Sequence, residues 1–181
     1  MNKNRNKFFI GQKEKMISLQ IKNTRDFMSK FLASDIFDKF LLDSAELKLG
    51  ITYNIDGHVN KAFYSESDES ELPAFDFSAW SEIRPKCFDL IKGKRTPLSF
   101  KFVMCTSPDK KNELLSSENF FEVKDQLSSF VFVIKYSEGH VVITTGAALS
   151  GFVLDKSYEK VWDDYIKSFL TEAQIDFDLD Y

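Results

Sequence analysis

The sequence has few of the residues from which common catalytic and metal sites are built. Its 181 residues include only two His, two Cys, seven Gly and four Pro. It contains no Gly-x-Ser-x-Gly, His-Glu-x-x-His, Gly-x-Gly-x-x-Gly or Cys-x-x-Cys motif, and no Walker spacing. With so little glycine, a loop that cradles phosphate with backbone N–H groups is not expected. The sequence therefore predicts no cofactor.

The two cysteines, Cys87 and Cys105, do not indicate an extracellular disulfide scaffold. A secreted domain of this size more often carries a larger, even set of cysteines. Both lie beside apolar residues, and free cysteine is among the most buried residue types. We therefore expect two reduced core thiols, and no zinc site because both His are distant in sequence.

Long apolar runs are also absent. The basic N-terminus contains only the run Phe8-Phe9-Ile10, which is too short for the core of a signal peptide. Nothing approaches the roughly 20 apolar residues that span a bilayer. We therefore expect a cytoplasmic protein that makes no contact with a membrane.

The residues that are abundant favour a well-packed globular domain. Hydrophobic residues make up 43% of the chain and charged residues 29%, and 19 residues are Phe. Each large ring that is buried contributes roughly 2–3 kcal/mol of transfer free energy. The formal charge of −4 disfavours a dedicated nucleic-acid binder, although a local basic patch remains compatible with it.

The chain divides into three parts by composition. Residues 1–15 are rich in Asn and Lys and have no period, which indicates either a disordered extension or a start assigned too early, with Met16 as the true initiator. Residues 16–172 are predicted to form a single α+β domain, and residues 173–181 an acidic tail. The acidic, Ser-rich stretch Ser65–Glu71 is interpreted as a mobile linker inside the domain.

Apolar periodicity and turn residues predict the elements of both halves. The first half has a strand from Ile17, a helix capped by Asn23 or Thr24, an alternating run through Leu47, Leu49, Ile51 and Tyr53, a hairpin turn at Asp56-Gly57 and a return strand through Val59, Ala62 and Phe63. The second half begins with a helix at Ser78–Ile91, in which Pro85 is a kink or boundary, followed by a turn at Lys92–Pro97 and a strand from Leu98. A helix capped by Ser107 comes next, and then strands at Phe130–Tyr136 and Val141–Thr145 that are joined by a Glu138-Gly139 turn. The half ends with a last strand at Phe152–Leu154 and a helix from Asp155.

The order of elements repeats, which suggests two β-α-β-β half-repeats at residues 16–64 and 97–154 joined by a linking helix. The tips Tyr53–Val59 and Tyr136–Val141 share a pattern: each has an acidic residue directly before Gly, and His and Val directly after it. Acidic-Gly pairs are also common in unrelated hairpins. Two such units in an antiparallel sheet resemble one sliding-clamp domain in element order alone, and a plain two-layer α+β sandwich fits equally well.

One segment resembles a known family. Cys87–Lys101, with the sequence CFDLIKGKRTPLSFK, is similar to the central motif of an uncharacterised bacterial family of unknown function. Phe37–Leu41, Thr144–Gly146 and Leu154–Asp164 are similar to its other landmarks. The resemblance covers Met16 to about Leu170. It implies no assigned activity, and it favours Met16 as the natural start.

The basic turn Lys92–Pro97 is the segment that looks most functional. Its cations could meet phosphates, because Arg95 offers a planar fork of donors. At a helix C-terminus the same cations could instead offset the exposed carbonyls and the helix dipole. The candidate anion-binding or nucleic-acid-binding residues are Arg84, Lys86, Lys92, Lys94 and Arg95.

Two functional hypotheses follow. The leading one is a non-enzymatic interaction module that binds protein or a nucleic-acid backbone through a sheet face or the Lys92–Arg95 turn. The alternative is a small enzyme of unrecognised type in which His58 and His140, each expected just past a hairpin, act in acid–base catalysis. No metal site is predicted, because the Asp residues near the C-terminus alternate with Phe177 and Leu179, as in an edge strand or solvated tail.

Overall fold

The computed structural model describes residues 17–64, 73–116 and 120–180, which form a mixed α+β fold as expected. The strands are β1 (Ser18–Ile21), β2 (Leu41–Lys48), β3 (Thr52–Asp56), β4 (Ser78–Ala79), β5 (Ser99–Cys105), β6 (Leu127–Ser137), β7 (His140–Leu149) and β8 (Phe177–Leu179). The helices are α1 (Thr24–Ala33), α2 (Trp80–Ile91), α3 (Pro108–Leu114), α4 (Phe121–Gln126) and α5 (Ser157–Glu172), with a 3-10 helix, η1, at Lys61–Phe63.

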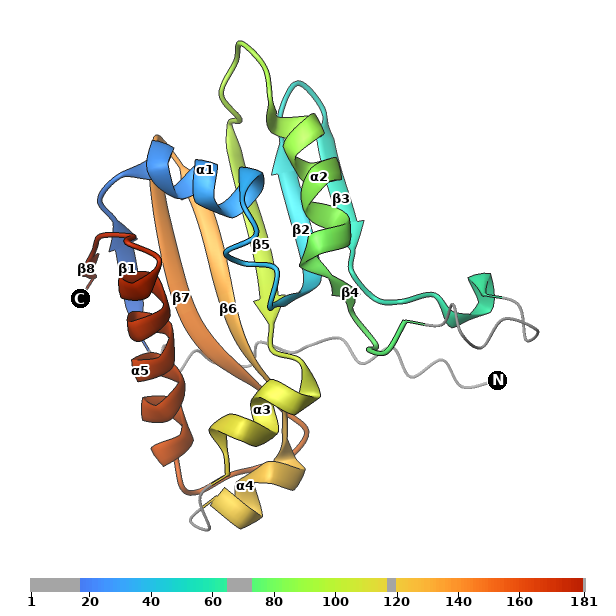
Figure 1. Cartoon of the computed structure of the whole chain (residues 1–181), viewed down its shortest axis with the longest axis vertical. Helices are drawn as coiled ribbons and strands as arrows, with labels where there is room; N and C mark the ends of the chain where they lie inside the picture. The colour runs from blue at the N-terminus through green and yellow to red at the C-terminus, as the bar shows by residue number, and fades with distance from the viewer. Residues whose placement is uncertain (1–16, 65–72, 117–119, 181) are drawn as a thin grey trace.

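The strands form one antiparallel sheet (Figure 1). Their order is β3-β2-β5-β6-β7-β1-β8, and β4 pairs with the beginning of β2. β1 and β2 are consecutive in the chain, yet β5, β6 and β7 lie between them. The connection through α1 must therefore cross the sheet, and this crossing places the helix over the central strands.

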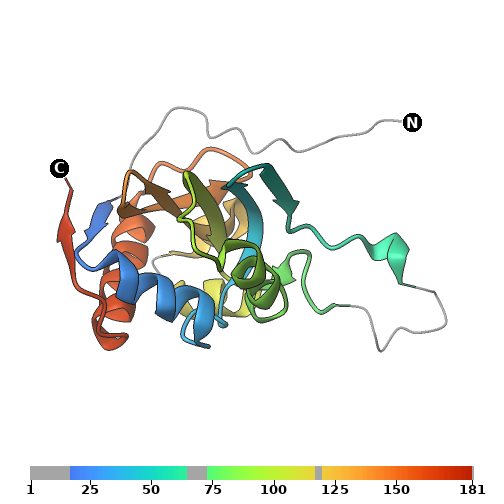
Figure 2. The same cartoon turned by 90° about the horizontal axis from the view of Figure 1, so that it is seen from above.

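Helices α1, α2 and α5 lie on one face of the sheet, and α3 and α4 lie at one end of it (Figures 1 and 2). Successive residues of a strand point to opposite faces. On β6, Phe132 and Ile134 are accordingly buried toward the helices, whereas Val131 and Val133 are only partly buried. We call the face away from these helices the open face.

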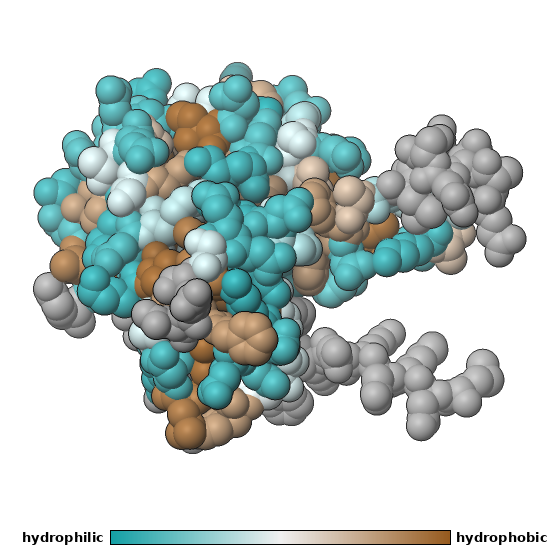
Figure 3. Space-filling model, turned by 60° about the horizontal axis from the view of Figure 1, so that its bottom comes forward, coloured by the Kyte–Doolittle hydropathy of each residue, from teal (hydrophilic) through white to brown (hydrophobic). Residues whose placement is uncertain are grey.

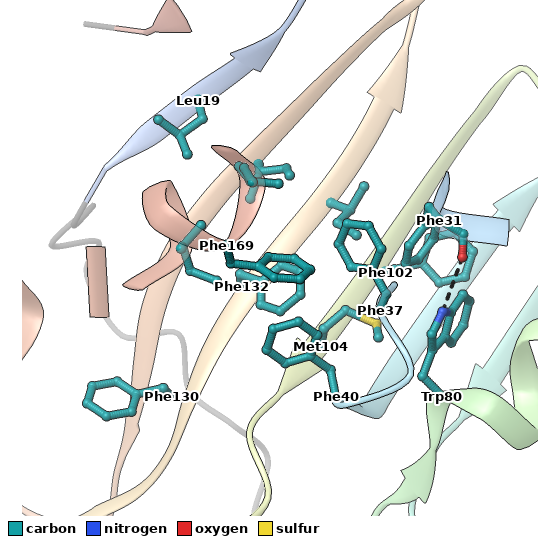
Figure 4. Close-up of a cluster of buried hydrophobic side chains, with 14 of the residues drawn as sticks. Leu19, Phe31, Phe37, Phe40, Trp80, Phe102, Met104, Phe130, Phe132 and Phe169 are labelled. Atoms are coloured by element: carbon teal, nitrogen blue, oxygen red, sulfur yellow. Dashed lines mark hydrogen bonds between the residues drawn. The ribbon is translucent and has the colours of Figure 1, made fainter. Parts of the chain in front are cut away.

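The core between the sheet and the helices is rich in aromatic rings (Figure 4). Phe31 of α1 stacks on Trp80 of α2 with ring centroids 4.6 Å apart, and meets Phe102 of β5 edge-on at 5.0 Å. The Trp80 indole N–H also donates to the Phe31 carbonyl at 3.3 Å. A second stack joins Phe130 of β6 to Trp162 of α5 at 5.0 Å. Such pairs add about 0.5–1.5 kcal/mol each beyond the burial of their area.

The predicted helix caps are confirmed. Asn23 caps α1, since its side chain accepts from the Asp26 N–H at 3.0 Å. Thr24, the other candidate, instead donates its hydroxyl proton to the Gly139 carbonyl at 2.9 Å. Ser107 caps α3 by accepting from the Lys110 N–H at 3.2 Å.

Of the two predicted hairpin turns, one is confirmed and one is wrong. Glu138 and Gly139 join β6 to β7 with φ of 52° and 86°, the positive values of a type I′ turn. Asp56-Gly57 is not a hairpin turn, because β2 has already turned into β3 at residues 49–51. The predicted return strand through Val59 and Phe63 is absent, and η1 lies there instead.

Gly57 has a different role from the predicted one. Its N–H donates to the Asp43 carbonyl of β2 at 2.8 Å, and its carbonyl accepts from the Ser78 N–H of β4 at 2.8 Å. A Cβ atom at this position would overlap the carbonyl oxygen of Leu42. Glycine is therefore required because two backbones approach closely, rather than because φ is positive.

Two further expectations in the second half need correction. No strand forms at Phe152–Leu154: both end residues are more than 80% exposed, and β7 is already paired on both sides by β6 and β1. α2 continues through Pro85, so this proline is not a boundary. The fully buried Trp80 and Cys87 on either side of it hold the helix against the core and outweigh the missing hydrogen bond.

The two halves have the predicted order of strand, helix and hairpin, but their strands pair differently. β1 lies between β7 and β8, far from β2, whereas β5 lies directly between β2 and β6. The internal duplication and the sliding-clamp-like arrangement therefore stay predictions. The alternation around Phe177 and Leu179 is an edge strand, β8, paired with β1.

Some predictions lie outside the described residues. These are the extension or early start at residues 1–15, Met16 as the initiator, and the linker Ser65–Glu71. Within the described ranges, no helix combines the length and the apolar character that a bilayer-spanning segment needs.

A polar link joins α5 to β7 and to the residue before β1. The Thr145 hydroxyl of β7 donates to the Asp163 carboxylate at 2.6 Å and accepts from the Ile17 N–H at 3.0 Å. Burial raises the pKa of Asp163 above its ordinary value of 3.8. The hydrogen bond from Thr145 and the nearby charge of Lys167 both lower this pKa, but the effect of burial is larger. The neighbouring Asp164 has a lowered pKa, because it accepts hydrogen bonds from Lys167 and Lys160.

Replacing Gly57 with Ala is expected to destabilise the fold. The new Cβ would overlap the Leu42 carbonyl, so β2 and the chain after β3 must separate, at a cost of about 2 kcal/mol or more. Gly50→Ala is the control, since nothing lies within 4 Å of that position, and it should stay within about 0.5 kcal/mol of wild type. Urea unfolding measures both, and equal stabilities would contradict the close approach.

Asp163→Asn and Asp164→Asn are expected to change stability in opposite directions as pH rises. The raised pKa of Asp163 means that its ionisation opposes folding, so Asp163→Asn, which keeps an acceptor for Thr145, should gain stability relative to wild type. The pKa of Asp164 is lowered, so its ionisation favours folding, and Asp164→Asn should be less stable than wild type. Both differences should be small at about pH 4 and larger at about pH 7 in urea titrations. Changes of the same sign would refute this assignment.

Candidate functional site

The open face carries the most distinctive arrangement of exposed residues in the described part of the chain. The strand register defines which side chains share it. They include Gln20, Ser44, Glu46, Lys48, Thr52, Asn54, Asp56, Ser99, Lys101, Val103, Val131, Val133, Lys135, Ser137, His140, Val142, Thr144, Gly146 and Asp178.

A row of side chains, all polar or charged except Val142, crosses this face from one edge of the sheet to the other. In spatial order it consists of Asn54, Glu46, Lys101, Lys135, Val142, Gln20 and Asp178. The centre of the row is cationic, because Lys101 and Lys135 are directly opposite each other on β5 and β6. Like charges in this position repel and destabilise the sheet.

Neither lysine of this pair is neutralised within the described structure. Both side chains are exposed, and neither makes an ion pair or hydrogen bond there. Glu46, the nearest carboxylate in the row, is paired with Lys48 at 3.0 Å. Among the described residues, nothing but solvent therefore relieves the repulsion between the two ammonium groups.

A band of small, mostly apolar side chains lies beside the lysine pair. Val103 is opposite Val133, Val133 is opposite Thr144, and Val131 is opposite Gly146. All five residues are partly exposed even though they lie on the central strands. The open face thus combines an apolar band with two cations at its border.

The structure separates the predicted basic residues into two groups. Arg84 is held by Asp38 through two hydrogen bonds of 2.8 and 2.9 Å, and Lys92 pairs with Asp89 at 2.7 Å. Both of these cations therefore have carboxylate partners in the described structure.

Lys86, Lys94 and Arg95 are exposed and make no ion pair with a described residue. The turn that carries Lys94 and Arg95 leads directly into β5, where the Leu98 N–H donates to the Lys48 carbonyl at 2.8 Å. This connection places the turn at the same end of the sheet as Lys48.

The family model for a family of unknown function, DUF5721, matches residues 30–178, which include the basic turn and the open face apart from its β1 residue Gln20. The chain belongs to the DUF5721 family. The expected membership of an uncharacterised family is therefore confirmed. No curated protein and no solved structure matches the chain. Because the function of the family is unknown, function has to be argued from the surface of this DUF5721 chain itself.

The two histidines are not brought together in this DUF5721 chain. His58 follows the edge strand β3, whereas His140 begins β7 on the open face, and β2, β5 and β6 lie between these strands. The Nδ1 atom of His58 lies 2.7 Å from the Asp56 carboxylate, a partner that sequence spacing alone did not identify. Joint acid–base work by the two histidines stays a prediction without support from their placement.

Sequence reasoning missed Lys101 and Lys135. Each stands between two apolar residues of a strand, in Phe100-Lys101-Phe102 and Ile134-Lys135-Tyr136. This alternation was sufficient to direct both lysines outward, but it did not reveal that β5 and β6 are neighbours in register. Their proximity depends on the pairing of strands, which the sequence pattern does not specify.

The buried thiols offer no nucleophile. Cys87 and Cys105 are free and buried, and burial raises the pKa of each thiol to about 12. A thiol with such a pKa remains protonated and inert at neutral pH. In the described residues no cluster of His, Cys, Asp and Glu could hold a metal ion.

Both thiols are expected to resist alkylation in the native DUF5721 protein. Iodoacetamide at about pH 8 should label neither Cys87 nor Cys105, because access and thiolate are both lacking. Adding denaturing guanidinium chloride should expose both to labelling, which mass spectrometry of the peptides can follow. Rapid labelling of either cysteine in the native protein would show that its burial is not maintained.

Proposed function

We propose that this DUF5721 chain is a protein-interaction module that binds an acidic, partly apolar segment of another protein on its open face. The observation that carries the proposal is the lysine pair Lys101 and Lys135, which is directly opposed and without a carboxylate partner in the described structure. A carboxylate placed between the two ammonium groups would relieve their repulsion. Each exposed ion pair contributes about 0.2–1 kcal/mol.

The apolar band favours a protein partner over a nucleic-acid backbone. Val103, Val131 and Val133 would gain free energy by leaving water, at roughly 25 cal/mol per Å² of buried apolar area. Phosphate groups offer no such surface. None of the described open-face residues is aromatic, so bases have no ring on which to stack. The formal charge of −4 also opposes a polyanion as large as nucleic acid.

The basic turn would extend the interface at one end. Lys94 and Arg95 lie beside the end of the sheet that carries Lys48, so a partner that crosses the open face can reach them. Rim charges of this kind mainly steer the encounter and raise the association rate. The free, buried thiols support our expectation that the module works in the reducing cytoplasm.

A photo-crosslinker on the open face tests this proposal. We would place p-benzoylphenylalanine at Val133 and irradiate the protein in a lysate of its source organism, with and without nuclease. The expected result is a nuclease-resistant crosslink to a segment rich in Asp, Glu and apolar residues. The partner would then be purified and its affinity measured by calorimetry.

Charge-reversal variants supply the control. Lys101→Glu/Lys135→Glu should weaken binding of the purified partner by at least about tenfold, because two attractions become repulsions. Lys156→Glu/Lys160→Glu makes the same change of charge at the start of α5, in the helical layer, and should not change the affinity. Equal affinities for the two double variants would refute the proposal. A crosslink that disappears with nuclease would favour nucleic acid instead.

A further inference from the structure

A second surface feature lies at the edge of the sheet, outside the open face. The chain that leaves β3 and the chain that enters β4 run side by side: His58 bridges to Phe77, and the Val59 N–H donates to the Asp76 carbonyl at 2.9 Å. A salt bridge of 2.7 Å between Lys61 and Asp76 also joins them. Figure 1 shows this arm projecting from the body beside β4.

A cavity of about 330 Å³ lies where the arm meets the body. Its walls come from the two segments of the arm, from β4 and from the first turn of α2. The volume is at the lower end of the range for small-molecule sites, roughly 300–1,000 Å³. Figure 3 shows apolar side chains gathered at the base of the arm, on the right of the view.

Aromatic rings form much of the lining. Phe63 and Tyr64 are perpendicular to each other with centroids 5.6 Å apart, and Phe77 lies 4.5 Å from the His58 ring. Phe63 is 83% exposed, so most of its ring is accessible to a ligand. The faces of such rings carry partial negative charge and attract cations.

His58 adds a hydrogen-bonding atom with a defined role. Its backbone N–H and its side chain both bind Asp56, and these hydrogen bonds lower the pKa of that carboxyl group. An ionised carboxylate only accepts, so the Nδ1 atom of His58 must be the donor. In the neutral ring, the Nε2 atom is then an acceptor for a ligand N–H.

The charged groups of the lining point to the sign of the ligand. Glu82 of α2 lines the cavity, is exposed, and makes no ion pair with any described residue. No Lys or Arg is among the described lining residues. An anion would therefore meet a carboxylate and ring faces, whereas a cation would meet complementary charge.

We propose that this cavity binds a small organic cation, in which a primary or secondary ammonium or a guanidinium group is attached to an apolar body. The ammonium group would pair with Glu82 and donate to the Nε2 atom of His58. The apolar body would contact Phe63, Tyr64 and Phe77. This site is separate from the open face and does not depend on the function proposed for it.

Benzylamine is a suitable probe, with benzyl alcohol and benzoate as its neutral and anionic counterparts. Amide chemical shifts of the isotope-labelled full chain would report binding, with changes expected at Ser78, Ala79 and Glu82. Benzylamine should bind at least about tenfold more tightly than benzyl alcohol, because the ion pair and cation–π contacts need the positive charge. Benzoate should not bind.

Two pairs of variants locate the site. Glu82→Gln should weaken benzylamine binding roughly tenfold, while Glu122→Gln on α4, another exposed glutamate, should have no effect. Phe63→Ala should also weaken it, whereas Phe121→Ala should not, although these two rings are 83% and 80% exposed. These surface changes are not expected to unfold the protein.

Three results would overturn the proposal: equal binding of all three probes, unchanged affinity in Glu82→Gln, or shift changes confined to residues outside the cavity. The variants also distinguish this proposal from the one made for the open face. Lys101→Glu/Lys135→Glu should leave benzylamine binding unchanged, and Glu82→Gln should leave the protein partner bound. Each proposal can therefore fail without the other.

Discussion

The rest of the structure depends on the aromatic contacts of Phe31. Because β1 and β2 lie far apart in the sheet, α1 has to cross its central strands, and Phe31 fixes where it crosses. Its ring contacts Trp80 of α2 and Phe102 of β5 together, so one side chain joins two helices and the sheet. The bond from the Trp80 indole to the Phe31 carbonyl makes this junction directional as well as apolar. α1 and α2 consequently share one face of the sheet, which α5 also covers through the stack of Trp162 on Phe130.

One-sided coverage explains the composition of the opposite face. The same strands must present rings to the core and tolerate water on the other side, so Phe102 and Phe132 alternate with Lys101, Val103 and Val133. Valine suits this position because it favours the strand conformation while remaining small enough for partial exposure. The lysine pair is harder to explain on structural grounds alone. Opposed cations cost stability, and a neutral polar pair would serve the fold equally well. Their presence therefore points to a requirement outside the fold.

Sequence reasoning succeeded where the signal was local and failed where it depended on strand pairing. The caps Asn23 and Ser107 and the Glu138-Gly139 turn follow from short-range chemistry, and all are found. Asp56-Gly57 has the same letters as a hairpin turn, but Gly57 is needed for its contact with β2. The α+β class and family membership could be predicted, while the lysine pair and the cavity could not. The lysine pair depends on the register of β5 and β6, and the cavity depends on how two irregular segments, 58–64 and 73–77, pack against β4 and α2.

The two proposed surfaces meet at Asp56. On β3 this residue is opposite Ser44, in the same row as Val103 and Val133 of the open face. Its carboxylate nevertheless orients His58 in the wall of the cavity. Directly after it, Gly57 is enclosed between β2 and β4, so the chain cannot shift here without disturbing both. A ligand that moves the His58 ring would act on Asp56 and hence on the border of the open face. The tight packing at Gly57 would limit that movement to side chains, which favours independent occupation of the two surfaces over a strongly coupled response.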